Sequence, residues 1–531
     1  MKARKPSMLF VSVLICVSTF SQDWKVYPYT PEGSFISFPA DEGRHPGEPV
    51  EWWYTTGHLT GETSGRTYSY MLSYFYSPVS VFDGFRILNV SDDGSGDFFS
   101  DTKALVYNVL ATDSLYIEAE LLYGSTEYWY NKTGGGGSAE PFSYVLSAEG
   151  DNASLQLYYD ATRPPLILAD SGLLDQGPEA YTYYYSLTGN NVTGSISFDG
   201  FTENVSGDGW IDRQYGTINP SEGLEYEWFS IQLSNGMDIN MNNIFTTDNN
   251  IPETLAYRLM CVYVDENTSF TGSSFQVERL AYEYTPDSLR CYSTRWRLTS
   301  EFHDIDLIIS VLHSTYEVTL PFRFYEGPVS ISGTVDGMPV EGKGFAELLH
   351  SYDKPDITID SRTNIGEEES VLKWQLNNPD DGNPLKYDLE YSTDGYIFQP
   401  LAGGLEDTVY IWDSSDLAEE NDTWLKVKGF SVDTTLVDSS SVKLISVTAI
   451  KETENEAAVN VFPNPGSGHF TVQGEGIREI LVFDIQGRKV FSSSVNSDLS
   501  HIDISDEASG IYFVKMIRHD NNIITRKLIK E

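Results

Sequence analysis

Residues 67–76 read TYSYMLSYFY, and every second residue from Tyr68 to Tyr76 is a tyrosine or a leucine. Successive side chains of a strand point to opposite faces of a sheet, so this period of two predicts a β-strand with one buried face. The predicted buried face holds Tyr68, Tyr70, Leu72, Tyr74 and Tyr76, and the opposite face holds Thr67, Ser69, Met71 and Ser73.

The same alternation recurs along the chain. Apolar residues alternate with serine, glutamine or threonine in 229–234 and again in 329–335. Asn-Gly at 235–236 and Asp-Gly at 336–337 follow these stretches, and such pairs favour the tight turns of β-hairpins. The mature chain shows no sustained helical period. We therefore predict an all-β protein built from sandwiches or closed barrels.

Length and charge restrict the classes of function. A chain of 531 residues is too long for one hydrophobic core and predicts roughly three or four folded units. Its 34 lysine and arginine residues are outnumbered by 78 acidic residues, which gives a formal net charge of −44. Such a chain repels nucleic acid and anionic lipid headgroups, so we expect neither as a partner. We interpret the acidity as a solubility property of an exported protein.

The N-terminus has the pattern of a secretory signal peptide, assigned to residues 1–22. A basic region precedes an apolar stretch at 8–17 and a short polar end at 18–22. The apolar stretch is too short to span a bilayer, and no later segment predicts a transmembrane helix. Ile15 precedes Cys16 where a lipoprotein signal requires a small residue, so no lipid anchor is expected.

Cys261 and Cys291 are the two cysteines of the mature chain. In an oxidising compartment they could form a disulfide that closes a loop of about 30 residues. Two unpaired cysteines in the hydrophobic core are the alternative, and the spacing leaves both open.

The last two segments differ in character from the rest. Residues 355–449 contain alternating strands, the first with Trp374, and resemble a fibronectin type III or immunoglobulin-like sandwich. Residues 450–531 carry Val-Phe-Pro-Asn-Pro at 461–465 and Val-Phe-Asp-Ile-Gln-Gly-Arg-Lys-Val at 482–490. This series closely resembles the C-terminal sorting domain of the type IX (Por) secretion system, a small β-sandwich. The resemblance implies a bacterial protein that the type IX machinery delivers to the medium or the outer surface.

Residues 23–354 hold a third set of motifs. They are Glu-Trp-Trp-Tyr-Thr-Thr-Gly-His-Leu at 51–59, Gly-Trp-Ile-Asp-Arg-Gln-Tyr-Gly at 209–216, Glu-Trp-Phe-Ser-Ile-Gln-Leu at 227–233, Glu-Gly-Pro-Val at 326–329 and Gly-Lys-Gly-Phe-Ala-Glu-Leu at 342–348. In this order they resemble the AttH/CrtC lipocalin-like family, which includes carotenoid (hydroxyneurosporene) hydratases. The resemblance implies two tandem lipocalin-like (calycin) β-barrels, at 23–205 and 206–354. It does not decide the function, because the family contains enzymes and members of unknown role.

Water addition to an isoprenoid double bond requires an acid that protonates the alkene, aromatic faces that stabilise the carbocation, and a nearby water. Asp212 lies in the Asp-Arg motif of the family and is our candidate proton donor. His45 and His58 are candidates to orient the water. The residues expected to line the ligand site are Trp52, Trp53, Tyr54, Tyr184, Trp210 and Trp228.

Each assignment has a structural alternative. Asp212 could form an ion pair with Arg213 between the barrels. The tryptophans at 52–53 could close one end of a barrel. Gln214 and Tyr215 also depart from the family pattern, in which glutamate and tryptophan are usual at these positions. The lost carboxylate weakens any acid–base mechanism that needs it.

Other chemistries find little support in the sequence. It contains no zinc motif, Gly-x-Ser-x-Gly elbow or dinucleotide loop, so we expect no metal or cofactor. The first hypothesis is a secreted tandem lipocalin-like protein that binds an apolar, isoprenoid- or lipid-like small molecule. The second is a hydratase (hydro-lyase) of the carotenoid hydratase type, with Asp212 as proton donor. A third, suggested only by the sandwich and sorting modules, is a protein directed at carbohydrate or another polymer.

Deleting residues from about 456 onward should trap the protein in the periplasm, because the sorting domain is the expected signal for passage across the outer membrane. Fractionation of the native host and immunoblotting would measure this. Unchanged delivery of the truncated chain to the surface or medium would defeat the sorting assignment.

Overall fold

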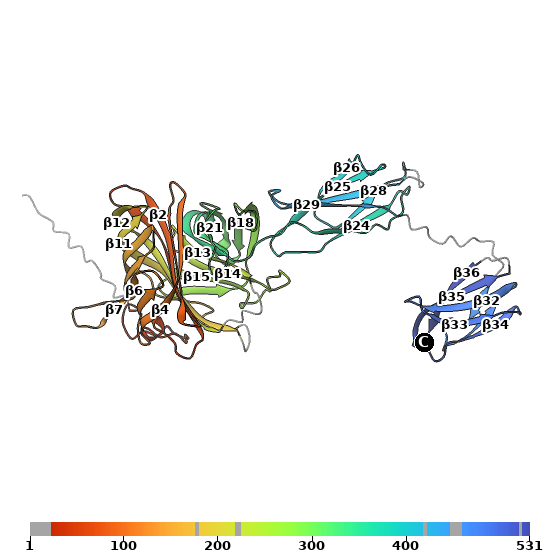
Figure 1. Cartoon of the computed structure of the whole chain (residues 1–531), viewed down its shortest axis with the longest axis horizontal. Helices are drawn as coiled ribbons and strands as arrows, with labels where there is room; N and C mark the ends of the chain where they lie inside the picture. The colour runs from red at the N-terminus through yellow and green to blue at the C-terminus, as the bar shows by residue number, and fades with distance from the viewer. Residues whose placement is uncertain (1–22, 176–179, 218–224, 418–421, 446–458, 520–522) are drawn as a thin grey trace, which may run out of the picture. The chain divides into compact units, whose positions relative to one another are not determined.

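The computed structural model describes residues 23–175, 180–217, 225–417, 422–445, 459–519 and 523–531. The predicted signal peptide lies outside these residues. Strands and turns dominate the described chain (Figure 1), and its helices are the short 3-10 segments η1 (Ala40–Glu42) and η3 (Phe302–Asp304). Within the described ranges, no helix has the length and hydropathy needed to span a bilayer. The predicted all-β class is confirmed.

The first large sheet closes into a barrel. Its strands follow the order β11-β12-β1-β2-β3-β4-β5-β6-β7-β8, and β8 pairs again with β11. Two short strands, β9 and β10, pair with β11. The strands are β1 (Val50–Gly61), β2 (Thr67–Val79), β3 (Phe82–Asp92), β4 (Asp97–Leu110), β5 (Tyr116–Leu121), β6 (Thr126–Thr133), β7 (Ala139–Glu149), β8 (Ala153–Ala161), β9 (Leu166–Ile167), β10 (Leu173–Asp175), β11 (Tyr181–Phe198) and β12 (Phe201–Thr217).

Strand alternation fills this barrel with side chains. The stretch 67–76 lies in β2, and its Tyr68, Tyr70, Leu72 and Tyr74 are each at most 1% exposed. They share one hydrophobic core with residues of β1, β3 to β9, β11 and β12. The barrel interior is therefore a packed core, and the outer face of β1, β2, β3 and β12 is left to meet another element.

The first sheet continues past the domain boundary predicted at 205. β12 pairs with β1 from Val205 to Gly216 and with β11 as far as Thr217. The change to the second sheet therefore falls between Thr217 and Glu225, where β13 begins. Residues near 200 form the turn of the long β11–β12 hairpin, which explains why a boundary there was wrong.

The second large sheet remains open. Its order is β16-β15-β14-β13-β22-β21-β19-β18-β17, with β20 paired to β21, and among the described residues no pairing joins β16 to β17. It is thus a half-barrel where the sequence predicts a second closed barrel. The strands are β13 (Glu225–Leu233), β14 (Asp238–Phe245), β15 (Arg258–Asp265), β16 (Thr268–Gly272), β17 (Gln276–Tyr284), β18 (Cys291–Ser300), β19 (Ile305–Val311), β20 (Glu317–Val318), β21 (Phe324–Val335) and β22 (Met338–Leu348).

Two smaller pairs of sheets follow. The first pair encloses a core around Trp374, and its seven strands in two sheets fit the predicted sandwich. These strands are β23 (Ile357–Ile359), β24 (Ser370–Leu376), β25 (Leu385–Ser392), β26 (Gln399–Leu405), β27 (Val409–Trp412), β28 (Trp424–Ser431) and β29 (Val437–Lys443). The second pair lies in a separate compact unit, residues 447–531, and has its own core. Its strands are β30 (Asn460–Phe462), β31 (His469–Gln473), β32 (Ile477–Asp484), β33 (Lys489–Ser494), β34 (Leu499–Asp503), β35 (Gly510–Arg518) and β36 (Ile523–Lys530).

The disulfide alternative for Cys261 and Cys291 is not realised in the structure, because the two thiols lie in different hydrophobic clusters. Cys261 packs in a cluster with Tyr184, whereas Cys291 packs in one with Tyr282 and Tyr352. Burial raises the pKa of Cys261 to about 11 and that of Cys291 to about 12. Both are free, buried thiols.

Each large sheet holds a buried ion pair. Arg213 is 1% exposed, pairs with Glu51, and lies 3.9 Å from the ring centre of Trp53. Arg279 pairs with Glu227 in the second sheet. A charge at such depth requires its partner, since an unpaired buried charge is strongly destabilising.

Replacing Arg213 by methionine should lower the free energy of unfolding by about 3 kcal/mol, because the buried Glu51 carboxylate then loses its most deeply buried partner and keeps Arg44 and His45. Urea unfolding would measure the change. The control Arg297→Met removes an exposed pair with Asp306 and should cost less than about 1 kcal/mol. Equal effects of the two changes would contradict a structural role for the buried pair.

Candidate active site between the two sheets

Strand β12 directs consecutive side chains to opposite sides of the first sheet. Arg213 points into the barrel toward Glu51, and Asp212 points outward. In the sheet register, Asp212 lies between Tyr54 on β1 and Ser186 on β11. The alternative of an Asp212–Arg213 ion pair is therefore not found, because alternation separates the two charges.

Asp212 is 3% exposed and accepts a hydrogen bond on each carboxyl oxygen. Tyr184 Oη donates to Oδ2 at 2.5 Å, and Trp210 Nε1 donates to Oδ1 at 2.6 Å. The Tyr184 hydroxyl also accepts from Trp228 Nε1 and from Asn240 Nδ2, both at 3.0 Å. Since Trp228 and Asn240 belong to the second sheet, these hydrogen bonds tie Asp212 to both sheets.

Two more carboxyl groups come from the second sheet. Glu326 on β21 and Glu347 on β22 stand opposite each other in register. Tyr54 of the first sheet donates to Glu326 at 2.9 Å, and Tyr226 donates to Glu347. Each of the three carboxyls thus has a tyrosine hydroxyl as donor.

Burial raises the pKa of all three carboxyls. The pKa of Asp212 rises to about 7, although its hydrogen-bond donors act in the opposite direction. The pKa of Glu326 is raised well above its usual range by burial and by the neighbouring charge of Glu347, whose own pKa burial also raises. Two adjacent carboxylates rarely ionise together, so the glutamate pair retains a proton near neutral pH.

An apolar, aromatic layer surrounds these acids. Trp52, Phe75 and Phe85 stand at its edge and are only partly buried. The Phe75 and Phe85 rings stack with centroids 4.5 Å apart, and Trp52 lies 6.1 Å from Phe75. The buried members of the layer are Tyr54, Met71, Ile87 and Trp210 from the first sheet and Trp228, Val318, Phe324 and Phe345 from the second.

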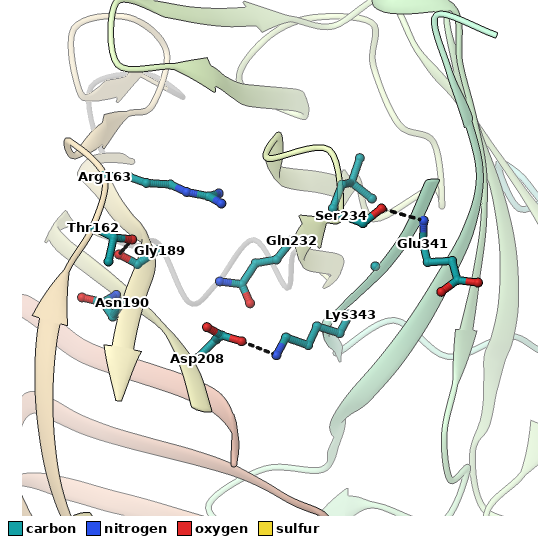
Figure 2. Close-up of a pocket in the computed structure, with 11 residues that line it drawn as sticks. Thr162, Arg163, Gly189, Asn190, Asp208, Gln232, Ser234, Glu341 and Lys343 are labelled. Carbon is teal, nitrogen blue, oxygen red and sulfur yellow. Dashed lines mark hydrogen bonds and ion pairs between the residues drawn. The ribbon is translucent and has the colours of Figure 1, made fainter. Parts of the chain in front are cut away.

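A polar pocket of about 400 Å³ opens between the same two sheets (Figure 2). Asp208 of β12 and Lys343 of β22 form an ion pair there at 2.5 Å, and Arg163 pairs with the buried Asp238. On β12, Asp208 precedes Asp212 by four residues, toward the end of the layer away from Trp52. The layer therefore has an aromatic edge at one end and a hydrophilic pocket at the other.

Polar side chains connect the pocket with Asp212. Asn240 Nδ2 donates to Ser186 Oγ at 3.0 Å, beside Asp212. Two residues away on the same strands lie the buried Thr188 and Asp238, and Asp238 reaches the pocket arginine. This row of side chains provides hydrogen-bonding groups between the pocket and the buried acid.

The predicted ligand-lining residues divide between the two faces of the first sheet. Trp52 and Tyr54 face the aromatic layer together with Trp210, as alternation requires. Trp53 points into the barrel, where it stacks on Arg213 and donates from Nε1 to a backbone carbonyl at 2.9 Å. Trp53 is thus a core residue of the barrel, apart from Asp212.

His45 also lies on the barrel side of the sheet. Its ring stacks on Tyr215 at 3.5 Å and is hydrogen-bonded to Asp41 and Glu51. Burial opposes the charged imidazolium, but these two acids raise the pKa of His45. The structure therefore places His45 in the network around Glu51 and does not bring it to Asp212.

His58 stands at the pocket end of β1. Its Nδ1 lies 3.1 Å from Ser69 Oγ, and its ring lies 5.1 Å from that of Phe345. Burial and the charge of Lys343 lower the pKa of His58 to about 3, so the ring is neutral at physiological pH. It shares the outward face with Tyr54 but is displaced by four residues, roughly 13 Å along the strand.

Sequence reasoning missed the acids Glu326 and Glu347 and the hydroxyl of Tyr226. Both glutamates lie in family motifs, but an acid in a strand is more often interpreted as facing solvent. A usable signal was the period of two: Glu326 follows Phe324 and Glu347 follows Phe345 by two residues, so each acid continues an apolar face.

Residues 29–352 match the AttH-like family, and the match covers both large sheets and all three carboxyls. The chain belongs to the AttH-like family. Kievitone hydratase from Fusarium solani subsp. phaseoli is 24% identical over 328 residues, which cover 56% of this chain and 82% of that protein. The crystal structure of an AttH protein from Nitrosomonas europaea has a TM-score of 0.51 at 20% identity, covering 61% of this chain and 99% of that one. This likeness supports the AttH-like fold.

Residues 460–531 match the secretion system C-terminal sorting domain. This AttH-like protein is therefore a secreted or outer-surface-attached bacterial protein, as predicted from its motifs. Ulvan lyase NLR42 from Nonlabens ulvanivorans is 32% identical over 95 residues, which cover 17% of this chain and 18% of that lyase. So short a match carries no information on activity.

The stability of the AttH-like protein should depend on pH through Asp212. Its pKa rises from 3.8 to about 7 on folding, so the proton that the folded state holds stabilises it at low pH, and this contribution is lost as pH rises through about 7. Between about pH 5 and pH 8, the free energy of unfolding of the wild type should fall by roughly 2–3 kcal/mol more than that of Asp212→Asn, because the amide holds no such proton. Urea unfolding at both pH values tests this, and parallel losses would contradict it.

Proposed function

We propose that this AttH-like protein is a secreted hydratase that adds water across a carbon–carbon double bond of an apolar, isoprenoid-like substrate. The observation that carries the proposal is the buried Asp212 carboxyl, whose pKa of about 7 leaves about half of the molecules protonated at neutral pH. Similarity to kievitone hydratase over most of that protein supports a hydratase-type reaction. A protonated acid in an apolar layer is the group that alkene protonation requires.

The proposed reaction begins with transfer of the Asp212 proton to one alkene carbon. The π electrons form the new C–H bond, and the other carbon becomes a tertiary carbocation. Trp210, Trp228 and Tyr54 belong to the aromatic layer around Asp212, and their rings would stabilise the positive charge. Water then forms the C–O bond and releases a proton, which restores the carboxyl of Asp212.

The two ends of the inter-sheet layer suit the two reactants. The partly buried aromatic edge at Trp52, Phe75 and Phe85 would be the apolar entry for the substrate. The polar pocket and the row through Asn240 and Ser186 offer hydrogen-bonding groups for water. Separate entry would bring water only to the side of the cation that faces the polar row.

The glutamate pair has a supporting role in this proposal. Glu326 and Glu347 can hold one proton between them, so the pair can accept and return the proton released by water. This would compensate for Gln214, which departs from the glutamate expected in the family motif and which donates to Thr182 Oγ1 at 2.9 Å. Simple binding of an apolar ligand without turnover is the alternative, and the Gln214 departure favours it.

Asp212→Asn should reduce hydration by several powers of ten, because the amide keeps the shape and cannot donate a proton at useful acidity. Affinity for the substrate should change little, and the melting temperature should not fall. A panel of prenyl alkenes, assayed by mass spectrometry for products heavier by one water, measures turnover. The matched control Asp306→Asn alters an exposed ion pair on the second sheet and should keep full activity.

Turnover retained in a folded Asp212→Asn protein would remove this residue from the mechanism. Absence of turnover in both the wild type and the variant, with prenyl ligands still bound, would favour the binding function.

A further inference from the structure

Two buried polar side chains on the outer face of the first sheet have no hydrogen-bond partner in the protein. Ser73 on β2 is 1% exposed, and its Oγ is unpartnered. Asn89 on β3 is 3% exposed, and both its Oδ1 and its Nδ2 are unpartnered. An asparagine with neither amide atom satisfied is unusual in a protein interior, where nearly all polar groups are paired.

The sheet register places these side chains beside the proposed reaction site. Tyr54 stands between Asp212 on β12 and Ser73 on β2. One strand further, Asn89 stands next to Met71. With strands about 4.8 Å apart, the backbone of Ser73 is roughly 10 Å from that of Asp212, and the backbone of Asn89 roughly 16 Å.

The two side chains lie beside apolar residues of the aromatic layer. Met71 and Ile87, their neighbours on the same face, belong to the aromatic layer. Glu326, which reaches the layer from the second sheet, has its Oε2 unpartnered as well. Burial keeps this acid protonated, so the layer offers hydrogen bonds with little net charge.

A purely structural role does not account for these residues. Leucine at 89 and alanine at 73 would fill similar space without burying an unsatisfied polar group. A ligand can complete the hydrogen bonds of such buried groups. Their favourable contribution to the free energy then appears only in the complex.

We infer that Ser73 and Asn89 determine specificity by binding an uncharged polar group of the substrate, a hydroxyl or a carbonyl, two to three strands away from Asp212. The asparagine amide can donate to such an oxygen and accept from its hydroxyl hydrogen. The substrate class is thus an amphipathic isoprenoid alcohol or ketone, and a pure hydrocarbon is a poor ligand. The inference rests on the proposed site between the sheets.

Binding of two probes of equal chain length tests the inference without any turnover. Farnesol carries a hydroxyl and farnesene does not, and quenching of tryptophan fluorescence reports binding near Trp52, Trp210 and Trp228. The wild type should bind farnesol at least about tenfold more tightly than farnesene. Asn89→Leu should bring the ratio close to one, with the farnesene affinity and the melting temperature maintained or raised, and Ser73→Ala should reduce the ratio in part.

The control Asn131→Leu changes a buried asparagine of the barrel whose amide is fully used, since it donates to Glu42 and accepts from the Leu115 amide, both at 2.8 Å. This variant should lower the melting temperature and leave the probe ratio unchanged. A melting temperature of Asn89→Leu that falls as far as that of Asn131→Leu would assign Asn89 a structural role and overturn the inference. Equal affinity of the wild type for both probes, or binding of neither, would overturn it too. Because no step depends on hydration, a failure of Asp212 as proton donor would be seen separately, in the turnover assay.

Discussion

The alternation of side chains along β12 is the constraint on which the site depends. It sends Arg213 into the barrel, where Glu51 and Trp53 receive the guanidinium, and sends Asp212 to the face that meets the second sheet. A slip of one residue would turn Arg213 away from Glu51, so the buried ion pair favours the observed register. With the register fixed, Asp212 can only lie against Tyr184, Trp210 and the second sheet, away from any cation that would lower its pKa.

The second sheet completes the buried environment of Asp212, and this burial makes ionisation of its acids unfavourable. Tyr54 of the first sheet donates a hydrogen bond to Glu326 of the second. Trp228 and Asn240 of the second sheet donate to the Tyr184 hydroxyl, which itself donates to Asp212. Three acids in one apolar layer are unfavourable for folding when ionised, so each favours its protonated form. Burial of the acids reduces stability at high pH and also makes the layer suited to proton donation. Functional sites commonly sacrifice some stability in this way.

The strands could be predicted from their period of two, because burial on one face selects residues such as Tyr70 and Leu72 directly. The role of Asp212 as the acid was expected from its motif and stays a prediction. The division of the Trp52-Trp53-Tyr54 run could not be assigned, since a sequence does not say which face of a closed barrel meets another sheet. The boundary near 205 failed for a related reason: a hairpin as long as β11–β12 carries a turn in its middle that resembles a domain limit. His45 was misplaced because the stacking on Tyr215 depends on contacts across the barrel.

The most direct test of this account is the protonation state of Asp212 itself. Difference infrared spectra between the wild type and Asp212→Asn, recorded across a pH titration, isolate the carbonyl band of a protonated carboxyl at this position. The account predicts a protonated-carboxyl band that is present near pH 6, disappears with a midpoint near 7 and is missing from the variant. A wild type without this band at pH 6, with Asp212 already ionised, would contradict the account.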